Sequence, residues 1–508
     1  MKTLKTLLWV IATILVAVSC KKEENFSLSF QQTGYYFKWG GNSVTINYTS
    51  TNVARVELKK ITDKWNCEIN HAARTIIVTP PADPGTEEER NELRTGTLSL
   101  NVISNKGNNS TYALTLYIIG DKEILLTDGN KYANCYVATE PVTVYTIDVS
   151  HNGGGEQLSG VENVKILWQS DNTPIENLSY SKEDGTATFF IDCAKDEDGE
   201  EDLLENGERV VPEGNSVLAA YNAAGEIIWS WHIWVVKSAD NPLTDHSTYS
   251  NGVTFMNKNL GAFANHNGNS EDTDLIHRSY GLYYQWGRKD PFPRPYAYNC
   301  SGGNDERIYN ASGSSTYTKI EEVSATVGNI EYSIKNPMVY ITNAASMGEN
   351  GDGVGDWMSS SNSNLWNDAE KSEYDPCPYG WRVPRSSDFD VLSLSAEEDT
   401  TDLDAARNRY GWTLTDANGN TYFYLGGGFR SYYNGKIVNM NHKGDALYPA
   451  PEPWEGYYWT SGVSADGKQS TCMYFDLTTT RSQTINKFHK NYPSKRSNGM
   501  QIRCVKEQ

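Results

Sequence analysis

Two segments in the last quarter of the chain combine aromatic rings with a basic side chain, which is chemistry suited to binding. The first contains Arg430, Tyr432 and Tyr433, and the second contains Trp454 and Tyr457. Tyrosine and tryptophan rings stack on sugar rings or on a protein partner, and arginine supplies hydrogen-bond donors beside them. We therefore expect these residues to form a ligand-binding surface. The alternative is that the rings pack into a domain core.

Carboxylate and amide oxygens recur in the glycine-rich segment 350–356, where they suit a calcium ion. Asn350, Asp352 and Asp356 supply these oxygens, and the glycines between them allow the chain to wrap tightly. A solvated loop is the simpler interpretation. The sequence therefore favours no metal or other cofactor, with calcium at this segment as the alternative.

Motifs for catalysis are absent from the sequence. None of the eight histidines falls in the HExxH spacing of zinc proteases, and neither GxSxG nor a phosphate-binding P-loop occurs. The cysteines form no CxxC pair of the kind that holds structural zinc. Paired carboxylates for glycoside hydrolysis stay open, because their separation is set in space and not along the chain. We expect a protein that is not an enzyme.

The N-terminus has the order of a secretory signal. Lys2 and Lys5 precede an apolar run at 7–18, which is too short to span a bilayer as a helix. Small residues then lead to Cys20, and the charged segment 21–24 follows, which resembles the lipobox and surface-export signal of Bacteroidetes lipoproteins. The resemblance implies that 1–19 is a signal peptide and that 20–24 is a lipidated anchor, with lipid on Cys20. The chain would then be exposed on the outer membrane. The alternative is an ordinary secretory signal with an incidental cysteine.

The charge balance limits the partners. The formal net charge is −20 at pH 7 over 508 residues. An acidic chain repels the phosphates of nucleic acid and anionic lipid headgroups, so we expect neither nucleic acid nor an anionic membrane surface as a partner. The abundance of tyrosine and tryptophan is typical of β-rich extracellular proteins.

Beyond the anchor, the chain divides into three blocks. Alternating apolar residues predict short antiparallel strands over 25–119 and again over 120–244, which indicates two β-sandwiches. The tryptophan-rich run 229–234 reads as a strand packed in a core, with a binding platform as the alternative. A polar linker leads into the third block, 245–508, where long loops surround short helices expected at 387–390 and 402–410. The fold class is therefore mainly β and multidomain, ending in an α+β domain.

The third block carries the most specific motif. Residues 375–384 read Asp-Pro-Cys-Pro-Tyr-Gly-Trp-Arg-Val-Pro, and 499–505 read Gly-Met-Gln-Ile-Arg-Cys-Val. These segments resemble the FISUMP (Fibrobacter succinogenes major paralogous) domain, a C-type-lectin-like family common on Bacteroidetes surface proteins. The resemblance implies a C-type-lectin-like fold for 245–508. We expect a disulfide between Cys377 and Cys504 to tie the ends of this domain together.

Weaker resemblances extend this interpretation. Trp65 with residues 94–98 resembles the BACON module, a small Ig-like domain of Bacteroidetes exoproteins. The order of the blocks resembles fimbrial tips, in which a lectin-like domain ends the chain. Together they imply an adhesin or a fimbrial tip or accessory subunit, with an extracellular glycan or protein as ligand and fimbrial subunits as further partners. The alternative is a glycan-binding lipoprotein of a polysaccharide-utilisation system.

The other cysteines leave the pairing open. Besides Cys20, Cys377 and Cys504 there is an odd number of them, so at least one stays free. Cys135 and Cys193 are the pair that we consider within the second block, although sequence alone does not determine connectivity. The cysteines concerned are Cys67, Cys135, Cys193, Cys300 and Cys472.

Overall fold

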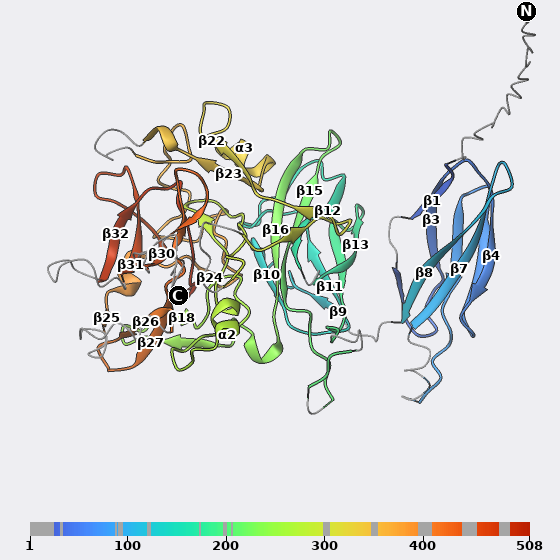
Figure 1. The fold of residues 1–508 in the computed structure, drawn as a ribbon, viewed down its shortest axis with the longest axis horizontal. Helices are drawn as coiled ribbons and strands as arrows, with labels where there is room; N and C mark the ends of the chain where they lie inside the picture. The colour runs from blue at the N-terminus through green and yellow to red at the C-terminus, as the bar shows by residue number, and fades with distance from the viewer. Residues whose placement is uncertain are drawn as a thin grey trace, which may run out of the picture. The chain divides into compact units, whose positions relative to one another are not determined.

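The computed structural model shows a mainly β chain with a few short helices (Figure 1). It describes residues 25–507 except 31–33, 87–88, 90–94, 119–122, 172–173, 197–200, 205–206, 298–304, 347–353, 395–408, 439–454 and 477–487. Cys20 and the expected signal and anchor, 1–24, therefore lie outside the described residues. In the described part, no helix is both long enough and apolar enough to span a membrane. The chain divides into two compact units, 1–119 and 120–508, which confirms the mainly β, multidomain fold class.

The first unit is a sandwich of two four-stranded sheets, drawn in blue in Figure 1. One sheet has the strand order β1-β3-β6-β5, and the other has the order β2-β8-β7-β4. The bounds are β1 Ser27–Phe30, β2 Gly34–Phe37, β3 Val44–Thr51, β4 Val53–Ile61, β5 Asn66–Asn70, β6 Thr75–Thr79, β7 Thr95–Ser104 and β8 Asn109–Ile118.

Alternation places every second residue of these strands in one core. Leu98, Leu100 and Val102 of β7 are completely buried, as the two-residue period of a strand requires. Trp65 packs on the backbone of β7 at Gly96, where an added Cβ would lie only 2.7 Å from the indole Nε1. The motif around Trp65 is therefore a packing motif, in which a bulky ring requires a glycine opposite it.

The second unit begins with another sandwich. Its smaller sheet has the order β13-β14-β11-β9, and its larger sheet has the order β10-β16-β15-β12-β20-β21. The bounds are β9 Glu123–Leu125, β10 Cys135–Ala138, β11 Thr143–Asp148, β12 Asn163–Ser170, β13 Glu176–Ser181, β14 Thr186–Ile191, β15 Gly214–Tyr221, β16 Ile227–Val235, β20 Ile308–Tyr309 and β21 Ser315–Thr316. The last two strands come from beyond residue 245, so the C-terminal block completes this sheet.

The tryptophan-rich strand β16 is buried on both faces. Trp229 and Trp231 point into the core between the two sheets, whereas Trp234 joins a core on the other face of the larger sheet. The Trp234 indole donates a hydrogen bond to the carbonyl of Ala262, at 2.9 Å. The interpretation of this run as a core strand is confirmed, and a binding platform there is excluded by burial.

The remaining elements form small sheets joined by long loops. The sheets have the orders β17-β18-β34-β24, β19-β33-β28-β29, β22-β23, β25-β26-β27 and β30-β31-β32. The strand bounds are β17 His246–Thr248, β18 Thr254–Met256, β19 Tyr284–Gln285, β22 Lys319–Glu322, β23 Val339–Thr342, β24 Trp381–Arg382, β25 Ser393–Leu394, β26 Gly411–Thr415, β27 Thr421–Leu425, β28 Phe429–Arg430, β29 Ile437–Val438, β30 Glu455–Val463, β31 Ser470–Asp476, β32 Phe488–Ser494, β33 Gly499–Met500 and β34 Val505–Lys506. Strand β34 pairs with both β18 and β24, so the last strand of the C-terminal block lies beside one of its first strands.

Helices occupy little of the described chain. The α-helices are α2 Thr273–Arg278 and α3 Ile330–Lys335, and the 3₁₀ turns are η1 Ser238–Asp240, η2 Ala344–Ser346 and η3 Ser386–Phe389. The helix expected at 387–390 is thus a single 3₁₀ turn, in which the Asp388 carboxylate accepts a hydrogen bond from the Arg385 N–H at 2.7 Å. The helix expected at 402–410 falls almost entirely outside the described residues.

The boundary expected near residue 244 does not separate two compact units. Cys135, Val217 and Trp234 of the larger sheet share one hydrophobic core with residues such as Trp286 and Trp459 of the C-terminal block. The C-terminal block also supplies β20 and β21 to that sheet. Domains 120–244 and 245–508 are therefore parts of one unit, because the larger sheet has an apolar outer face that must be covered.

A histidine in this shared core predicts a pH effect on stability. The His232 ring donates from Nε2 to Asn215 Oδ1 at 2.8 Å, and burial lowers its pKa to about 3. An unfolded histidine has a pKa of about 6.5. Between these values the unfolded state binds a proton that the folded state does not, so the free energy of unfolding falls as the pH drops.

We expect the His232→Asn variant to lack this loss of stability. From this group alone, the wild type should lose about 1.4 kcal/mol per pH unit below pH 6.5. Urea unfolding at several pH values between 7 and about 4 measures the slope. The matched control is His246→Asn, at an exposed imidazole, which should keep the wild-type slope. Equal slopes for the wild type and His232→Asn would contradict the prediction.

Candidate functional site

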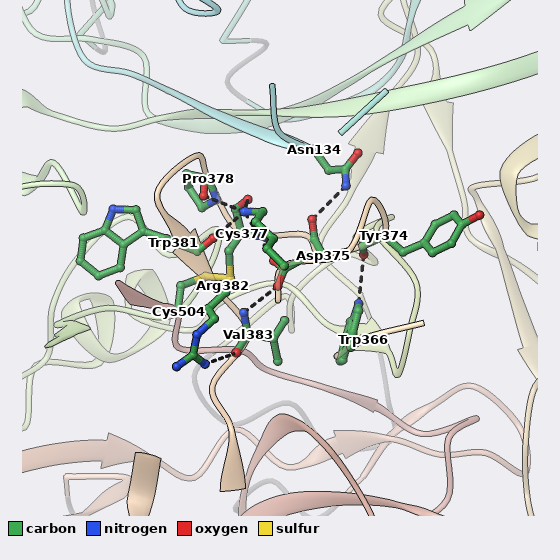
Figure 2. Close-up of a disulfide and its surroundings, with 11 residues drawn as sticks. Asn134, Trp366, Tyr374, Asp375, Cys377, Pro378, Trp381, Arg382, Val383 and Cys504 are labelled. Carbon is green, nitrogen blue, oxygen red and sulfur yellow. Dashed lines mark hydrogen bonds and ion pairs between the residues drawn. A yellow bond between two sulfur atoms is a disulfide. The ribbon is translucent and has the colours of Figure 1, made fainter. Parts of the chain in front are cut away.

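Cys377 and Cys504 are joined by a disulfide at the corner that residues 375–384 form (Figure 2). The two Cα atoms are 6.1 Å apart. The carboxylate of Asp375 accepts hydrogen bonds from the backbone N–H groups of Cys377 at 2.8 Å and Val383 at 2.9 Å. The disulfide that we expected is therefore present, and the aspartate that opens the motif fixes the turn around it.

A largely buried lysine also stabilises this corner. Lys371 Nζ donates to the carbonyls of Cys377 at 2.7 Å, Pro378 at 2.9 Å and Trp381, and lies 3.7 Å from Asp375 Oδ1. Burial lowers the pKa of Lys371 and raises the pKa of Asp375, and the attraction between the two charges opposes both shifts. The Lys371 ammonium and the Asp375 carboxylate thus bind backbone groups of the corner, so these two side chains support the fold.

The corner is also attached to the larger sheet. Asn134, which precedes β10, donates from Nδ2 to the carbonyls of Glu373 at 2.6 Å and Asp375 at 2.9 Å. Its side-chain oxygen accepts a hydrogen bond from the Trp229 indole at 3.0 Å. Figure 2 shows Asn134 reaching from the sheet toward this backbone. The contact fixes the C-terminal block on the sandwich.

The prediction that Arg430 contacts a ligand is wrong. Its side chain is buried and lies among aromatic rings, 5.7 Å from the centroid of Tyr340 and 5.9 Å from that of Phe292. It donates from Nη1 to the carbonyl of Gly435 at 2.8 Å and forms an ion pair with Asp305. The charge is compensated inside the protein, as burial requires.

The prediction for Tyr457 is also wrong, because the ring is in the core. Its hydroxyl donates to Glu455 Oε2 at 2.6 Å, and its ring contacts Phe429 and Tyr474 with centroids 4.9 Å apart in each case. Trp454 lies outside the described residues.

Two residues of the expected surface remain accessible. Tyr433 is 49% exposed, whereas Tyr432 is half-buried beneath Lys495 Nζ, which lies 4.0 Å from the centre of its ring. Among the described residues of this expected surface, Tyr433 is the one that is exposed.

The calcium candidate is only partly described. Asn350 and Asp352 lie outside the described residues. Asp356 is buried, and its Oδ2 lies 3.2 Å from the guanidinium of Arg496 while its Oδ1 accepts the N–H of Met358 at 2.9 Å. Asp356 is therefore buried with its charge compensated by Arg496, so its proposed role as a calcium ligand is wrong. Within the described ranges, no group of three or more histidine, cysteine, aspartate or glutamate side chains is placed to hold a metal.

The pairing of Cys135 with Cys193 is not present. Both thiols are free and buried, as is that of Cys472, and Cys67 is free and half-buried. Cys135 packs in the core beneath the C-terminal block, whereas Cys193 lines a separate cavity and its thiol contacts the carbonyl of Asp202 at 3.4 Å. The two side chains are thus directed into different environments. Cys300 lies outside the described residues.

A cavity that the sequence does not indicate lies at the edge of the larger sheet. Its volume is about 950 Å³, and it is open to solvent. Strand register explains part of its lining: Ser170 pairs with Ile308, and Ile308 pairs with Thr316. One step further along each strand, Asp171, Arg307 and Tyr317 all line the cavity. Residues far apart in sequence therefore meet because three short strand ends coincide.

Two tyrosines and a set of ion pairs form the accessible part of this cavity. Tyr296 is 48% exposed and Tyr317 is 74% exposed. Glu306 is held by both Nε (2.9 Å) and Nη2 (2.8 Å) of Arg294. Asp305 is held by Arg430, so the arginine that the sequence assigned to the ligand instead orients a carboxylate in the cavity wall.

Comparisons with known proteins do not identify a function for this chain. No model of a known protein family and no curated protein matches the chain. A mutant of the SrpA adhesin from Streptococcus sanguinis matches at 10% identity over 23% of this chain and 68% of that chain, with a TM-score of 0.16. Bacteroides ovatus SGBP-B, in complex with a mixed-linkage heptasaccharide, matches at 10% identity over 42% of this chain and 71% of that chain, with a TM-score of 0.13. Scores this low carry no argument about fold or ligand.

Proposed function

We propose that this chain is a non-enzymatic lipoprotein of the bacterial surface, anchored to the outer membrane through Cys20, that acts as an adhesin. The observation that carries the proposal is the open cavity with two exposed tyrosines. Concave sites with aromatic walls and a few fixed polar groups favour ligand binding. The N-terminal sequence and the acidic composition support display on the cell surface.

The family assignments belong to this proposal. The disulfide between Cys377 and Cys504 supports a FISUMP-type, C-type-lectin-like arrangement of 245–508. The eight-stranded sandwich of the first unit, with Trp65 packed on Gly96, supports a BACON-like module that serves as a spacer.

A binding role fits the cavity better than catalysis. A glycoside hydrolase needs one carboxylic acid with a raised pKa to protonate the leaving group. Asp305 and Glu306 each face a guanidinium instead of an apolar wall. These carboxylates are therefore placed to accept hydrogen bonds, and we propose that the protein is not an enzyme.

A second candidate is a glycan-binding lipoprotein of a polysaccharide-utilisation system. The exposed rings of Tyr296 and Tyr317 favour it, because flat aromatic faces stack on sugar rings. In a variant of the first proposal, the chain is a fimbrial tip or accessory subunit, and other fimbrial subunits are its partners.

An array of glycans and extracellular-matrix proteins, probed with the purified protein with and without calcium, tests the proposal. Saturable binding to matrix proteins is the result expected for an adhesin of protein ligands, and saturable binding to one glycan class fits an adhesin of glycans or the second candidate. Co-purification with a fimbrial shaft supports the tip variant. Failure to bind any spot and any fimbrial subunit would contradict a binding role.

A further inference from the structure

We infer that the cavity lined by Tyr296 and Tyr317 is a calcium-independent binding site for neutral carbohydrate. The inference rests on the proposed binding function and adds the ligand class and the residues that contact it. Neither Tyr433 nor Asp356 is among the residues that line this cavity.

The charges around the cavity cancel. Its lining includes the carboxylates of Asp171, Asp305 and Glu306 and the guanidinium of Arg307. Arg430 and Arg294 stand directly behind Asp305 and Glu306 as their ion-pair partners. Three negative groups are thus matched by three positive groups, and a charged ligand gains no net attraction. A neutral ligand that forms hydrogen bonds is favoured.

The histidine of this cavity adds no charge. His277 belongs to α2, and its ring donates from Nε2 to the carbonyl of Pro295 at 3.1 Å. Burial, followed by the nearby charge of Arg294, lowers the pKa of His277, so the imidazole is neutral at pH 7. The balance of charges in the cavity therefore holds across the neutral pH range.

The polar groups are oriented before any ligand arrives. Both oxygens of Glu306 bind the Arg294 guanidinium, and the Glu306 N–H donates to the Arg294 carbonyl at 2.9 Å. A carboxylate oxygen has more than one lone pair, so each can still accept a hydrogen bond from a sugar hydroxyl. Fixed acceptors reduce the entropy lost on binding.

The two tyrosines supply the stacking faces. Tyr296 and Tyr317 keep much of their surface exposed although buried tyrosines are common in this protein, so packing does not account for their position. A volume of about 950 Å³ is that of a site for several sugar units and not for a single ion. Aromatic faces beside carboxylate acceptors suit the apolar face and the hydroxyls of a pyranose.

Metal-independence follows from the same ion pairs. Asp305 and Glu306 are already neutralised by arginines, which a cation would have to displace. Among the residues that the structure describes, no set of three ligating side chains surrounds a common point. Hydrogen bonding and stacking are therefore sufficient for the ligand.

Isothermal titration of the purified protein with defined hexasaccharides tests this inference. The probes are neutral oligomers of glucose, mannose, galactose and xylose, with hyaluronan and heparin hexasaccharides as charged counterparts, each in EDTA and in calcium. We expect at least one neutral probe to bind equally in both buffers. Tyr317→Ala and Tyr296→Ala should each weaken that binding by about tenfold or more. The matched control Tyr379→Ala, at a ring that is 54% exposed, should leave the affinity unchanged.

Each of the other possible results of this titration contradicts the inference in part or in whole. Unchanged affinity in the Tyr296→Ala and Tyr317→Ala variants places the glycan elsewhere and leaves the proposed function intact. Loss of binding in EDTA would contradict the calcium-independence of the site. Binding to charged probes alone would contradict a neutral carbohydrate as its ligand. Binding of matrix protein without any glycan overturns the inference while the adhesin proposal stands. A protein that binds neither glycan nor protein contradicts both.

Discussion

The Arg430→Met variant is expected to lose about 3 kcal/mol of stability, because it removes one partner of a largely buried ion pair. Asp305 would keep its charge without the guanidinium, and the Gly435 carbonyl would lose its donor. The methionine fills part of the volume but cannot supply the donors. The aromatic rings around the guanidinium would lose their cation–π contacts as well.

Hydrogen–deuterium exchange measures this loss within each compact unit. Peptides from 120–508 should exchange faster in the Arg430→Met variant, and peptides from 25–119 serve as an internal control. Arg209→Met is the matched substitution, since Arg209 forms a solvent-accessible ion pair with Glu201 at 2.7 Å and should cost at most about 1 kcal/mol. A loss in Arg430→Met no greater than that in Arg209→Met would show that the ion pair is not important for the fold.

The burial of Arg430 also explains why sequence reasoning assigned it to the surface. Arginine next to tyrosines has the composition of a binding site, and the carboxylate that compensates its charge is Asp305, which is remote in sequence. Tyr457 misleads in the same way, since Glu455 accepts its hydroxyl and neighbouring rings cover it. Composition within a segment does not reveal such partners, because they are determined by the tertiary fold.

Local patterns succeeded where the period of the strand decides burial. Residues 98, 100 and 102 alternate with polar positions, and their side chains are buried in the sandwich of the first unit. The same rule was insufficient for β16. Ser230 and His232 are polar and alternate with its buried tryptophans, yet both are buried as well, and Ser230 donates a hydrogen bond to Asp290 of the C-terminal block. The continuous core of 120–508 could therefore not be predicted from alternation alone.

The cavity was missed for a geometric reason. Its residues come from α2, from the chain at and just beyond the ends of β12 and β21, and from 293–296 and 305–308, and none of these segments has a recognisable motif. Tyr317 stands alone in a polar run, Ser-Ser-Thr-Tyr-Thr at 314–318. The only local signal is thus a single tyrosine that alternates with hydroxyl-bearing residues. Strand register is needed to bring it beside Arg307 and Asp171.

Removing the disulfide is expected to have the largest effect on stability. The double variant Cys377→Ser, Cys504→Ser opens a loop that spans 127 positions. On the chain-entropy model, closing so long a loop removes about 4–5 kcal/mol of denatured-state entropy. Lys371 and Asp375 still hold the corner by hydrogen bonds in the variant, so the native arrangement persists while the unfolded state gains freedom.

Guanidinium unfolding with and without reductant separates this effect from lost packing. The reductant should lower the midpoint of the wild type to that of the double variant, and it should leave the midpoint of the double variant unchanged. Cys472→Ser, at a buried free thiol, is the matched control: it changes packing but must keep the response to reductant. A wild type that is indifferent to reductant, although its disulfide is shown by thiol labelling to be reduced, would contradict the prediction. In that case the hydrogen bonds of Lys371, Asp375 and Asn134 alone would hold the corner closed, and the cysteines would contribute only packing.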